Sequence, residues 1–172
     1  DYRNYPSFRG GGQRFRSRVS LGASSSEFVI AFTEPWLFDR PLRLDLEVWN
    51  RSIGTNRAYD EKGTGFKAGL IRKLKVPFWR QSIGYRIEAI EISDIDNDYS
   101  ARFRAAEDGS DTISALSLGF TRDHRDQIVY PSSGSLVNLF GELQSKVIGS
   151  YSNLYKLTAR GEKYWPIFKK SV

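Results

Sequence analysis

Three short segments of the chain carry residue types that are associated with chemistry. His124, the only histidine, lies in the charged segment TRDHRDQ, and a lone histidine in a turn is usually solvent-exposed rather than catalytic. In SDIDND, Asp94, Asp96 and Asp98 have the spacing of a calcium loop, but the glycine and the terminal glutamate of an EF-hand are missing. The glycines of RGGGQ are not followed by a helix that would complete a phosphate site. These segments predict polar loops and turns, without a catalytic residue, a metal site or a cofactor.

The composition favours a β-rich protein. The 172 residues include 15 glycines, 9 tyrosines and 11 phenylalanines but no cysteine or methionine, which excludes a disulfide framework and a thiolate metal site. No apolar run approaches the roughly 20 residues of a membrane-spanning helix. The chain begins at Asp1 without a start methionine or a signal peptide, so we expect a mature piece or a segment of a longer protein. Residues 1–172 are expected to form a single segment.

The net charge of +6 could suggest a nucleic-acid partner. The arginines, however, are spread through strand-like segments and form no basic arm or tail. We therefore do not expect nucleic acid to be the partner.

A period of two residues recurs along the chain, whereas the 3.6-residue period of a helix is nowhere sustained. The clearest example is LRLDLEVW, residues 42–49, in which leucine and valine alternate with charged residues and tryptophan. Such segments cover residues 13–23, 27–32, 42–49, 65–70, 83–89, 116–120, 137–143 and 155–160. They predict about eight antiparallel strands, each near the 9–11 residues of a membrane-spanning strand.

The connections between these segments are of two kinds. Compact or proline-bearing connections alternate with longer polar ones, and consecutive antiparallel strands place alternate connections at opposite ends of a sheet. Tryptophan and tyrosine residues gather beside the compact connections, as in the aromatic girdle at a membrane–water interface. The girdle is expected to contain Trp36, Phe38, Trp79, Tyr130 and Trp165.

Alternation alone also fits a soluble β-sandwich whose apolar face is turned inward. Strand length, the two kinds of connection and the aromatic residues at one end favour a transmembrane antiparallel β-barrel instead. In that fold the apolar residues face lipid, and the charged residues face a wet lumen, where their mixed signs suggest ion-pair networks. The expected lumen-facing charges are Arg14, Arg16, Arg18, Arg43, Asp45, Glu47, Arg86, Glu88, Lys156 and Arg160. The expected lipid-facing residues are Phe15, Val19, Leu21, Leu42, Leu44, Leu46, Val48, Ile83, Ile87, Leu116, Leu118, Phe120 and Leu157.

Three segments resemble the BamA-type outer-membrane insertase barrels, the bacterial surface antigen family. SSEFVIAFTEPWLFDRPLRLDLEVW resembles a hairpin in which one strand ends in a Thr-Glu-Pro-Trp-Leu-like corner before the next begins. SLGFTRDHRDQIVYPSSGSLVNLFGEL is similar to a strand–turn–strand unit whose turn runs into Pro-x-x-Gly. NYPSFRGGGQRFRSRVSLG resembles the entry to the family's second strand. In this order, the three segments span most of the chain.

The resemblance implies a sixteen-stranded barrel in the outer membrane of a Gram-negative cell, of which this chain is the N-terminal half. It implies periplasmic POTRA domains before the barrel, accessory assembly lipoproteins, and client β-barrel proteins whose strands add to an exposed edge without a cofactor. The compact turns would then be periplasmic, and the aromatic belt would thin the surrounding bilayer.

Parts of that family are not present in this sequence. No POTRA-like segment occurs, and Arg160-Gly161 is followed by Glu162 rather than completing the family's Val-Arg-Gly-Phe motif. Eight strands also suffice for a small closed barrel. The sequence therefore leaves open whether the chain is half of a larger barrel or closes alone.

The expected function is that of an outer-membrane protein assembly factor, not an enzyme, with membrane lipids and client barrels as partners. Three alternatives stay open: a sister-branch exporter or translocation-assembly barrel, a soluble basic β-domain that binds polyanions, and a purely structural barrel.

Overall fold

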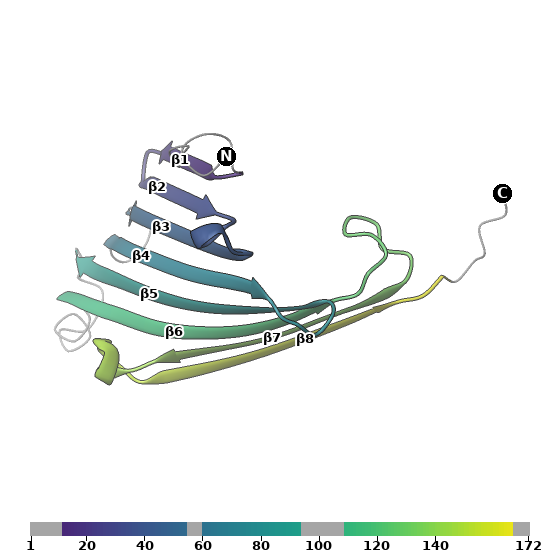
Figure 1. Ribbon diagram of the computed structural model, residues 1–172. Coiled ribbons are helices and arrows are strands. Elements are labelled where there is room, and N and C mark those ends of the chain that lie inside the picture. The colour runs from purple at the N-terminus through teal and green to yellow at the C-terminus, as the bar shows by residue number, and fades with distance from the viewer. Residues whose placement is uncertain (1–11, 55–59, 94–108, 167–172) are drawn as a thin grey trace.

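A computed structural model describes residues 12–54, 60–93 and 109–166, which form one antiparallel sheet (Figure 1). The order of the eight strands in the sheet is their order in the chain, and each strand pairs with its sequence neighbours. The strands are β1 (Arg14–Leu21), β2 (Ser25–Glu34), β3 (Leu42–Ile53), β4 (Asp60–Lys73), β5 (Trp79–Ser93), β6 (Gly109–Asp123), β7 (Gly134–Gln144) and β8 (Leu154–Tyr164). Two 3-10 turns, η2 (Leu37–Asp39) and η3 (Lys146–Ile148), lie in the connections.

The all-β antiparallel architecture predicted from the two-residue period is confirmed. Four strands are longer than the predicted 9–11 residues: β3 has 12 residues, β4 has 14, and β5 and β6 have 15 each. Their additional pairs, such as Asp60 with Ser93, lie beyond the apolar stretch. Backbone pairing continues there because it needs no apolar side chain, so side-chain periodicity alone underestimates strand length.

The sheet is open. Figure 1 shows a curved sheet with β1 and β8 at its two margins, and these two strands do not pair with each other. The described residues therefore do not form a closed eight-stranded barrel.

The connections separate into two ends, as the sequence predicted. Because strand direction alternates, β2–β3, β4–β5 and β6–β7 connect at one end, which we call the aromatic end. The other connections meet at the opposite end, which we call the loop end. Within the ranges described above, no helix is long and apolar enough to cross a membrane.

The register across the sheet defines two faces, because residues directly opposite each other in an antiparallel pair point to the same side. One row crosses the whole sheet and runs from the first residue of β1, Arg14, to the third residue of β8, Lys156. Its members are Arg14, Thr33, Asp45, Gly69, Gly84, Ser117, Glu142 and Lys156. We call the side to which this row points the polar face, and the other side the apolar face.

Burial is concentrated on the polar face. The buried hydrophobic residues of the described chain are Val29, Trp49 and Ala115, and the register places all three on that face. A soluble sandwich would instead bury its apolar face against a second layer.

The proline-bearing corner between β2 and β3 contains two residues in the left-handed conformation. Phe38 and Asp39 have positive φ angles of 56° and 57°, and the corner is closed by an Asp39 N–H···O Trp36 hydrogen bond of 3.1 Å. The left-handed conformation costs roughly 1 kcal/mol or more for a residue with a Cβ atom. Pro35 and Pro41 flank these residues, and because proline lacks a backbone N–H they end the hydrogen-bond ladders of β2 and β3 on either side of the corner. Phe78, in the β4–β5 turn, is also left-handed, with φ of 67°.

Candidate functional site

The ten charged residues predicted to face a lumen all lie on the polar face. The register places them in alternation along four strands, β1, β3, β5 and β8, from Arg14, Arg16 and Arg18 on β1 to Lys156 and Arg160 on β8. This placement agrees with the predicted side of the sheet, whereas contact with an aqueous lumen remains a proposal.

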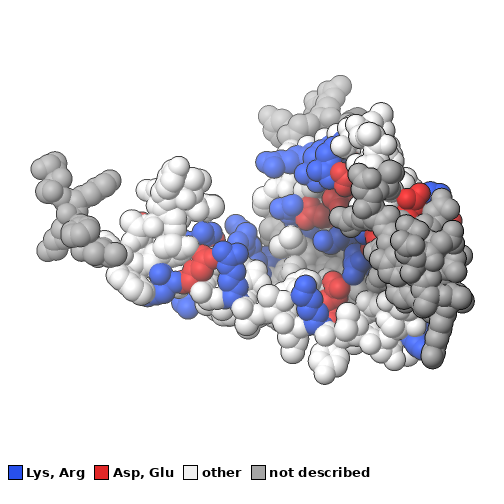
Figure 2. All heavy atoms as spheres, turned by 180° about the vertical axis from the view of Figure 1, so that it is seen from behind, with Lys and Arg blue, Asp and Glu red and all other residues white. Residues whose placement is uncertain are grey.

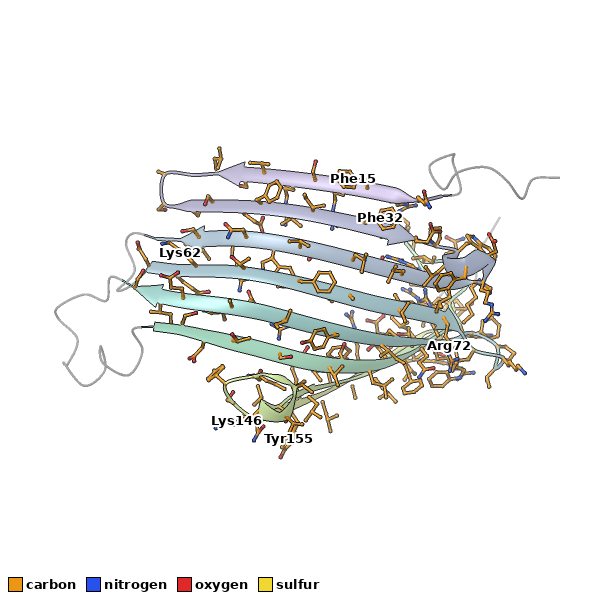
Figure 3. The ribbon with its side chains drawn as sticks, turned by 60° about the vertical axis from the view of Figure 1, so that its left-hand side comes forward. Phe15, Phe32, Lys62, Arg72, Lys146 and Tyr155 are labelled. Carbon is orange, nitrogen blue, oxygen red and sulfur yellow. The ribbon has the colours of Figure 1, made fainter. Side chains whose placement is uncertain are left out.

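The thirteen residues predicted to face lipid all lie on the apolar face. Most of them are exposed, including Val48 and Ile83 at 45% and 50% in the middle of the sheet. Figure 3 shows Phe15 and Phe32 on neighbouring strands, and the two residues form a direct pair. The described chain leaves most of this face uncovered; the exception is Ser114 of β6, which is fully buried near the loop end.

The polar face is hollow. A cavity of about 1010 Å³ lies against it, lined by residues from β1 to β7 that include Arg16, Asp45, Lys67, Ser82, Ser117 and Phe140. Figure 2 shows the hollowed side with basic and acidic side chains interleaved over the strands. The polar face is therefore the concave face of the curved sheet, and the apolar face is convex.

Side chains on the concave face reach each other across an intervening strand. Arg86 Nη2 of β5 lies 3.2 Å from Glu142 Oε1 of β7, although β6 separates these strands. Strands two apart in a sheet are separated by about 9.6 Å. Two long side chains close that distance where curvature brings them together.

Glu88 is the centre of this network. Only 4% of its surface is exposed, and it accepts hydrogen bonds from three residues on two strands. Arg51 Nη2 and the Trp49 indole Nε1 approach Glu88 Oε1 at 2.7 and 3.1 Å, and Arg86 Nη1 approaches Oε2 at 3.0 Å. A buried carboxylate is stable when it is paired and hydrogen-bonded in this way.

A glycine on β4 makes this arrangement possible. A Cβ atom on Gly65 would lie 2.2 Å from Cζ2 of Trp49, so only glycine leaves space for the indole to cross β4 toward Glu88. The sequence-based site residues included Glu88 and Arg86 but not Trp49, Arg51 or Glu142. The alternation placed Trp49 among the charged residues, which is the signal that could have identified it.

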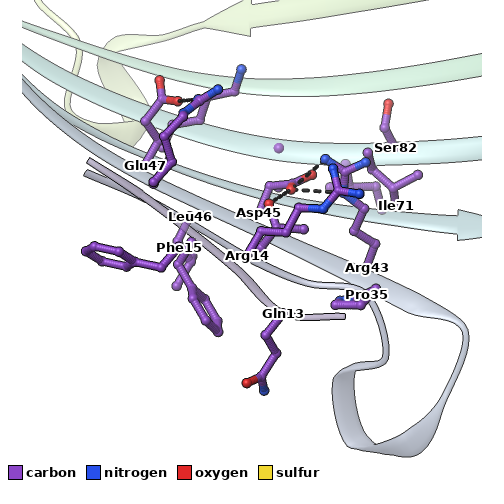
Figure 4. Close-up of a pocket in the computed structure, with 18 of the residues that line it drawn as sticks. Gln13, Arg14, Phe15, Pro35, Arg43, Asp45, Leu46, Glu47, Ile71 and Ser82 are labelled. Atoms are coloured by element: carbon purple, nitrogen blue, oxygen red, sulfur yellow. Dashed lines mark hydrogen bonds and ion pairs between the residues drawn. The ribbon is translucent and has the colours of Figure 1, made fainter. Parts of the chain in front are cut away.

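The aromatic end of the hollow is basic. Arg43 forms an ion pair of 2.8 Å with Asp45, which also accepts a 2.7 Å hydrogen bond from Thr33 Oγ1. Arg14 and Lys67 line the same cavity without an ion pair to a described residue. In Figure 4, Arg14 and Arg43 lie around Asp45.

Four of the five aromatic residues predicted to form a girdle lie in or next to connections at the aromatic end, and the fifth, Trp165, follows the end of β8 at the same end of the sheet. Trp79 is the first residue of β5 and lies on the apolar face, directly opposite Arg122. The other four, Trp36, Phe38, Tyr130 and Trp165, are exposed. Their level is consistent with a girdle, which remains a proposal.

The β6–β7 turn is held by Asp126. Its carboxylate accepts hydrogen bonds from the Ser132 hydroxyl and from the N–H groups of Gln127, Ser132 and Ser133. The Ser132 hydroxyl, followed by the Ser133 N–H, lowers the pKa of Asp126 from 3.8 to about 2. Gly134, with φ of 110°, ends the turn where a Cβ atom would lie 2.0 Å from the His124 carbonyl oxygen. This requirement explains the glycine of the Pro-x-x-Gly segment.

The residues considered for chemistry are not assembled into a catalytic or metal site in the described chain. His124 is exposed, and its ring makes an edge-on contact of 4.5 Å with Phe78. Among the described residues, no group of three histidine, aspartate or glutamate side chains is placed to hold a metal ion. Asp94, Asp96 and Asp98 lie outside those residues.

Comparison with known proteins identifies the family of this sheet. The whole sheet, from Arg14 on β1 to Tyr164 on β8, lies within the match to the Omp85 superfamily domain, which extends over residues 7–172. The outer membrane protein assembly factor BamA of Nitratidesulfovibrio vulgaris is 26% identical over 142 residues, which cover 81% of this chain and 17% of that protein. The crystal structure of BamA from Haemophilus ducreyi lacking POTRA domains 1–3 matches with a TM-score of 0.71 and 16% identity.

The structural match covers 93% of this chain and 33% of the Haemophilus ducreyi chain. This chain therefore spans about a sixth of the curated relative and a third of the solved one. The predictions of a BamA-type barrel fold and of a family of the outer membrane are confirmed. The sheet described above, with its hollow polar face and exposed apolar face, belongs to the Omp85 superfamily.

Proposed function

We propose that this chain is part of the barrel wall of an outer-membrane protein assembly factor, which inserts β-barrel proteins into the outer membrane. The observation that supports it best is the division of the sheet into a hollow charged face and a convex apolar face. In a barrel wall the convex face meets lipid and the concave face meets water.

The distribution of charge along the strands supports this orientation. On the apolar face, charged residues occur only within three residues of a strand end, at Glu34, Asp60, Lys62, Arg72, Glu91, Arg122 and Lys163. On this face of β3 the apolar side chains run from Leu42 to Val48, a length of about 20 Å at about 3.3 Å per residue. That length is close to the apolar band of about 25 Å on outer-membrane barrels.

The assembly role rests on family membership and on the curated relative, which is named as an assembly factor. An unpaired strand edge can template a client strand through backbone hydrogen bonds, and such an edge would be the physical route for insertion. In the complete protein, further strands of the barrel would pair with the outer edges of β1 and β8. Accessory lipoproteins would be partners. The client would then be templated where that barrel opens.

The test is client folding by the full-length protein. Liposomes that contain it should accelerate the folding of an unfolded outer-membrane barrel, which is followed by the heat-sensitive shift of the folded client on a gel. Protein-free liposomes provide the control. Unchanged client folding, together with export of a co-expressed secreted substrate, would support an exporter and reject the assembly role.

The orientation of the wall has a separate test that uses the absence of cysteine from this chain. Leu157 and Thr158 are adjacent, exposed and on opposite faces of β8. In full-length protein without other reactive thiols, Thr158→Cys should react with a membrane-impermeant maleimide, and Leu157→Cys should not. Equal labelling in folded protein would contradict the proposed orientation.

A further inference from the structure

The apolar face carries an asymmetric border of charge. At the loop end, its charged residues are Lys62, Asp60 and Glu91, which are of mixed sign. At the aromatic end, they are the cations Arg72, Arg122 and Lys163 and a single acid, Glu34. Figure 3 shows Lys62 and Arg72 toward opposite ends of β4. The aromatic border therefore has a net positive charge.

The three cations occupy equivalent positions. Each is the second-to-last residue of a strand that ends at the aromatic end: Arg72 on β4, Arg122 on β6 and Lys163 on β8. All three are exposed. Because they lie on alternate strands, they are about 9.6 Å apart across the strands.

These cations lack an internal counter-ion. None of them forms an ion pair with a described residue, and the Nε group of Arg72 donates only to the neutral Gln81 side chain, at 2.9 Å. Glu34 is engaged by the Gln13 side chain and by the Trp36 N–H. On the polar face, in contrast, Arg16, Arg51 and Arg86 are paired with carboxylates. Unlike these three arginines of the hollow, the border cations have no carboxylate partner among the described residues and remain available to an external anion.

Aromatic side chains lie at the same level. Trp79 is directly opposite Arg122 on the apolar face, and such opposite pairs have Cβ atoms about 5 Å apart. Tryptophan prefers the headgroup region of a bilayer, and long basic side chains extend from the apolar band toward it. Arginine also binds phosphate oxygens through two parallel N–H donors.

We propose that Arg72, Arg122 and Lys163 bind the phosphate groups of anionic phospholipids in the leaflet at the aromatic end. This inference rests on the proposed function only in that the apolar face must meet lipid. The site is a row of single headgroup contacts on the outside of the wall. It anchors the aromatic end to an anionic leaflet.

The test measures lipid preference in the full-length protein. It is reconstituted into phosphatidylcholine vesicles containing spin-labelled phosphatidylglycerol or spin-labelled phosphatidylcholine, and the motionally restricted fraction of each label is measured by electron paramagnetic resonance. We expect about a threefold preference for phosphatidylglycerol. The triple variant Arg72→Gln, Arg122→Gln, Lys163→Gln should reduce this preference to near unity.

A matched variant controls for net charge. Arg14→Gln, Arg16→Gln, Arg18→Gln removes the same number of charges from the concave face and should retain the preference. Folding of both variants is checked by the heat-sensitive gel shift. If the border variant folds and keeps the preference, or if both variants lose it equally, the headgroup row is rejected. If no label is restricted, the lipid-facing wall itself fails, whereas the assembly role is judged independently by client folding.

Discussion

The indole Nε1 of Trp49 lies 3.1 Å from Oε1 of Glu88, although the strands that carry them are not neighbours in the sheet. The indole crosses β4 over Gly65 and joins β3 to β5 directly. Arg86 extends the connection from Glu88 to Glu142 on β7. Side-chain bonds of the concave face thus span five consecutive strands and hold the curvature that the backbone ladder alone leaves adjustable.

Replacement of Glu88 should be strongly destabilising. Glu88→Ala leaves Arg51, Arg86 and the Trp49 N–H without their shared acceptor, and we expect a loss of about 2–3 kcal/mol because the two arginines are partly exposed. Urea unfolding of the full-length protein in lipid vesicles measures it. Glu91→Ala, on the apolar face near the loop end of the same strand, is the control and should change stability by less than about 0.5 kcal/mol. Equal effects of the two substitutions would rule out a central role for Glu88.

Gly65→Ala should displace the indole of Trp49. Its Cβ atom would overlap the ring at 2.2 Å, and we expect about 1–3 kcal/mol of destabilisation. Gly69→Ala, on the same strand and face, has its nearest neighbour at 3.9 Å and should be tolerated. In the double variant with Trp49→Ala, most of the cost of Gly65→Ala should disappear; strict additivity in the unfolding free energies would contradict the contact.

The ion pair between Arg16 and Glu47 should contribute little. Its atoms are 3.5 Å apart and its side chains are 71% and 39% exposed, so solvent screens the attraction. Arg16→Ala should therefore alter the unfolding free energy by no more than about 0.5 kcal/mol. A larger loss would show that the hollow is less hydrated than a water-filled lumen.

The β6–β7 turn should be sensitive only to strong acid. Because the folded-state pKa of Asp126 is below 3.8, its stabilisation is present above pH 3.8 and is lost as the pH falls through about 2. Carbon NMR of labelled aspartate should show this low titration midpoint in detergent micelles. Ser132→Ala removes the hydroxyl that contributes most to the lowered pKa of Asp126, so this pKa should rise. Ser133→Ala keeps the backbone N–H donor, so the pKa of Asp126 should not change. A midpoint near 3.8 in the unsubstituted protein would refute the described turn.

A charge on the convex face should cost more than the same charge on the concave face. Leu157→Arg places a guanidinium against lipid and should destabilise the full-length protein by about 1–3 kcal/mol, depending on depth. Thr158→Arg, at the adjacent residue, places the guanidinium on the concave face and should leave stability nearly unchanged. Denaturant titrations in lipid vesicles compare the two, and a reversed order would require the sheet to be turned inside out.

The two-residue period identified all eight strands and the face of each residue, because alternation is a local property of the chain. In LRLDLEVW, for example, it correctly separated Leu44 and Leu46 from Asp45 and Glu47. It could not identify the partners of Glu88, which depend on register and curvature across strands distant in sequence. Arg51 and Glu142 come from strands that pattern alone does not bring near β5. Which face contacts lipid and which contacts water likewise depends on the surroundings of the sheet, and the alternation of residues does not specify it.

The row of opposite residues that crosses the sheet has a geometric consequence. The row begins at Arg14, the residue of β1 at the aromatic end, and reaches β8 at Lys156. The residue of β8 at the aromatic end is Tyr164, eight positions further along the strand. At about 3.3 Å per residue this offset is about 26 Å over a width of about 34 Å, a slope of about 38°. Strands of cylindrical sheets incline by 35–45° to the cylinder axis. The strand ends thus shift by about one residue per strand relative to the row of paired residues. Where the first and last strands of a complete cylinder pair, their register must accommodate the sum of these shifts.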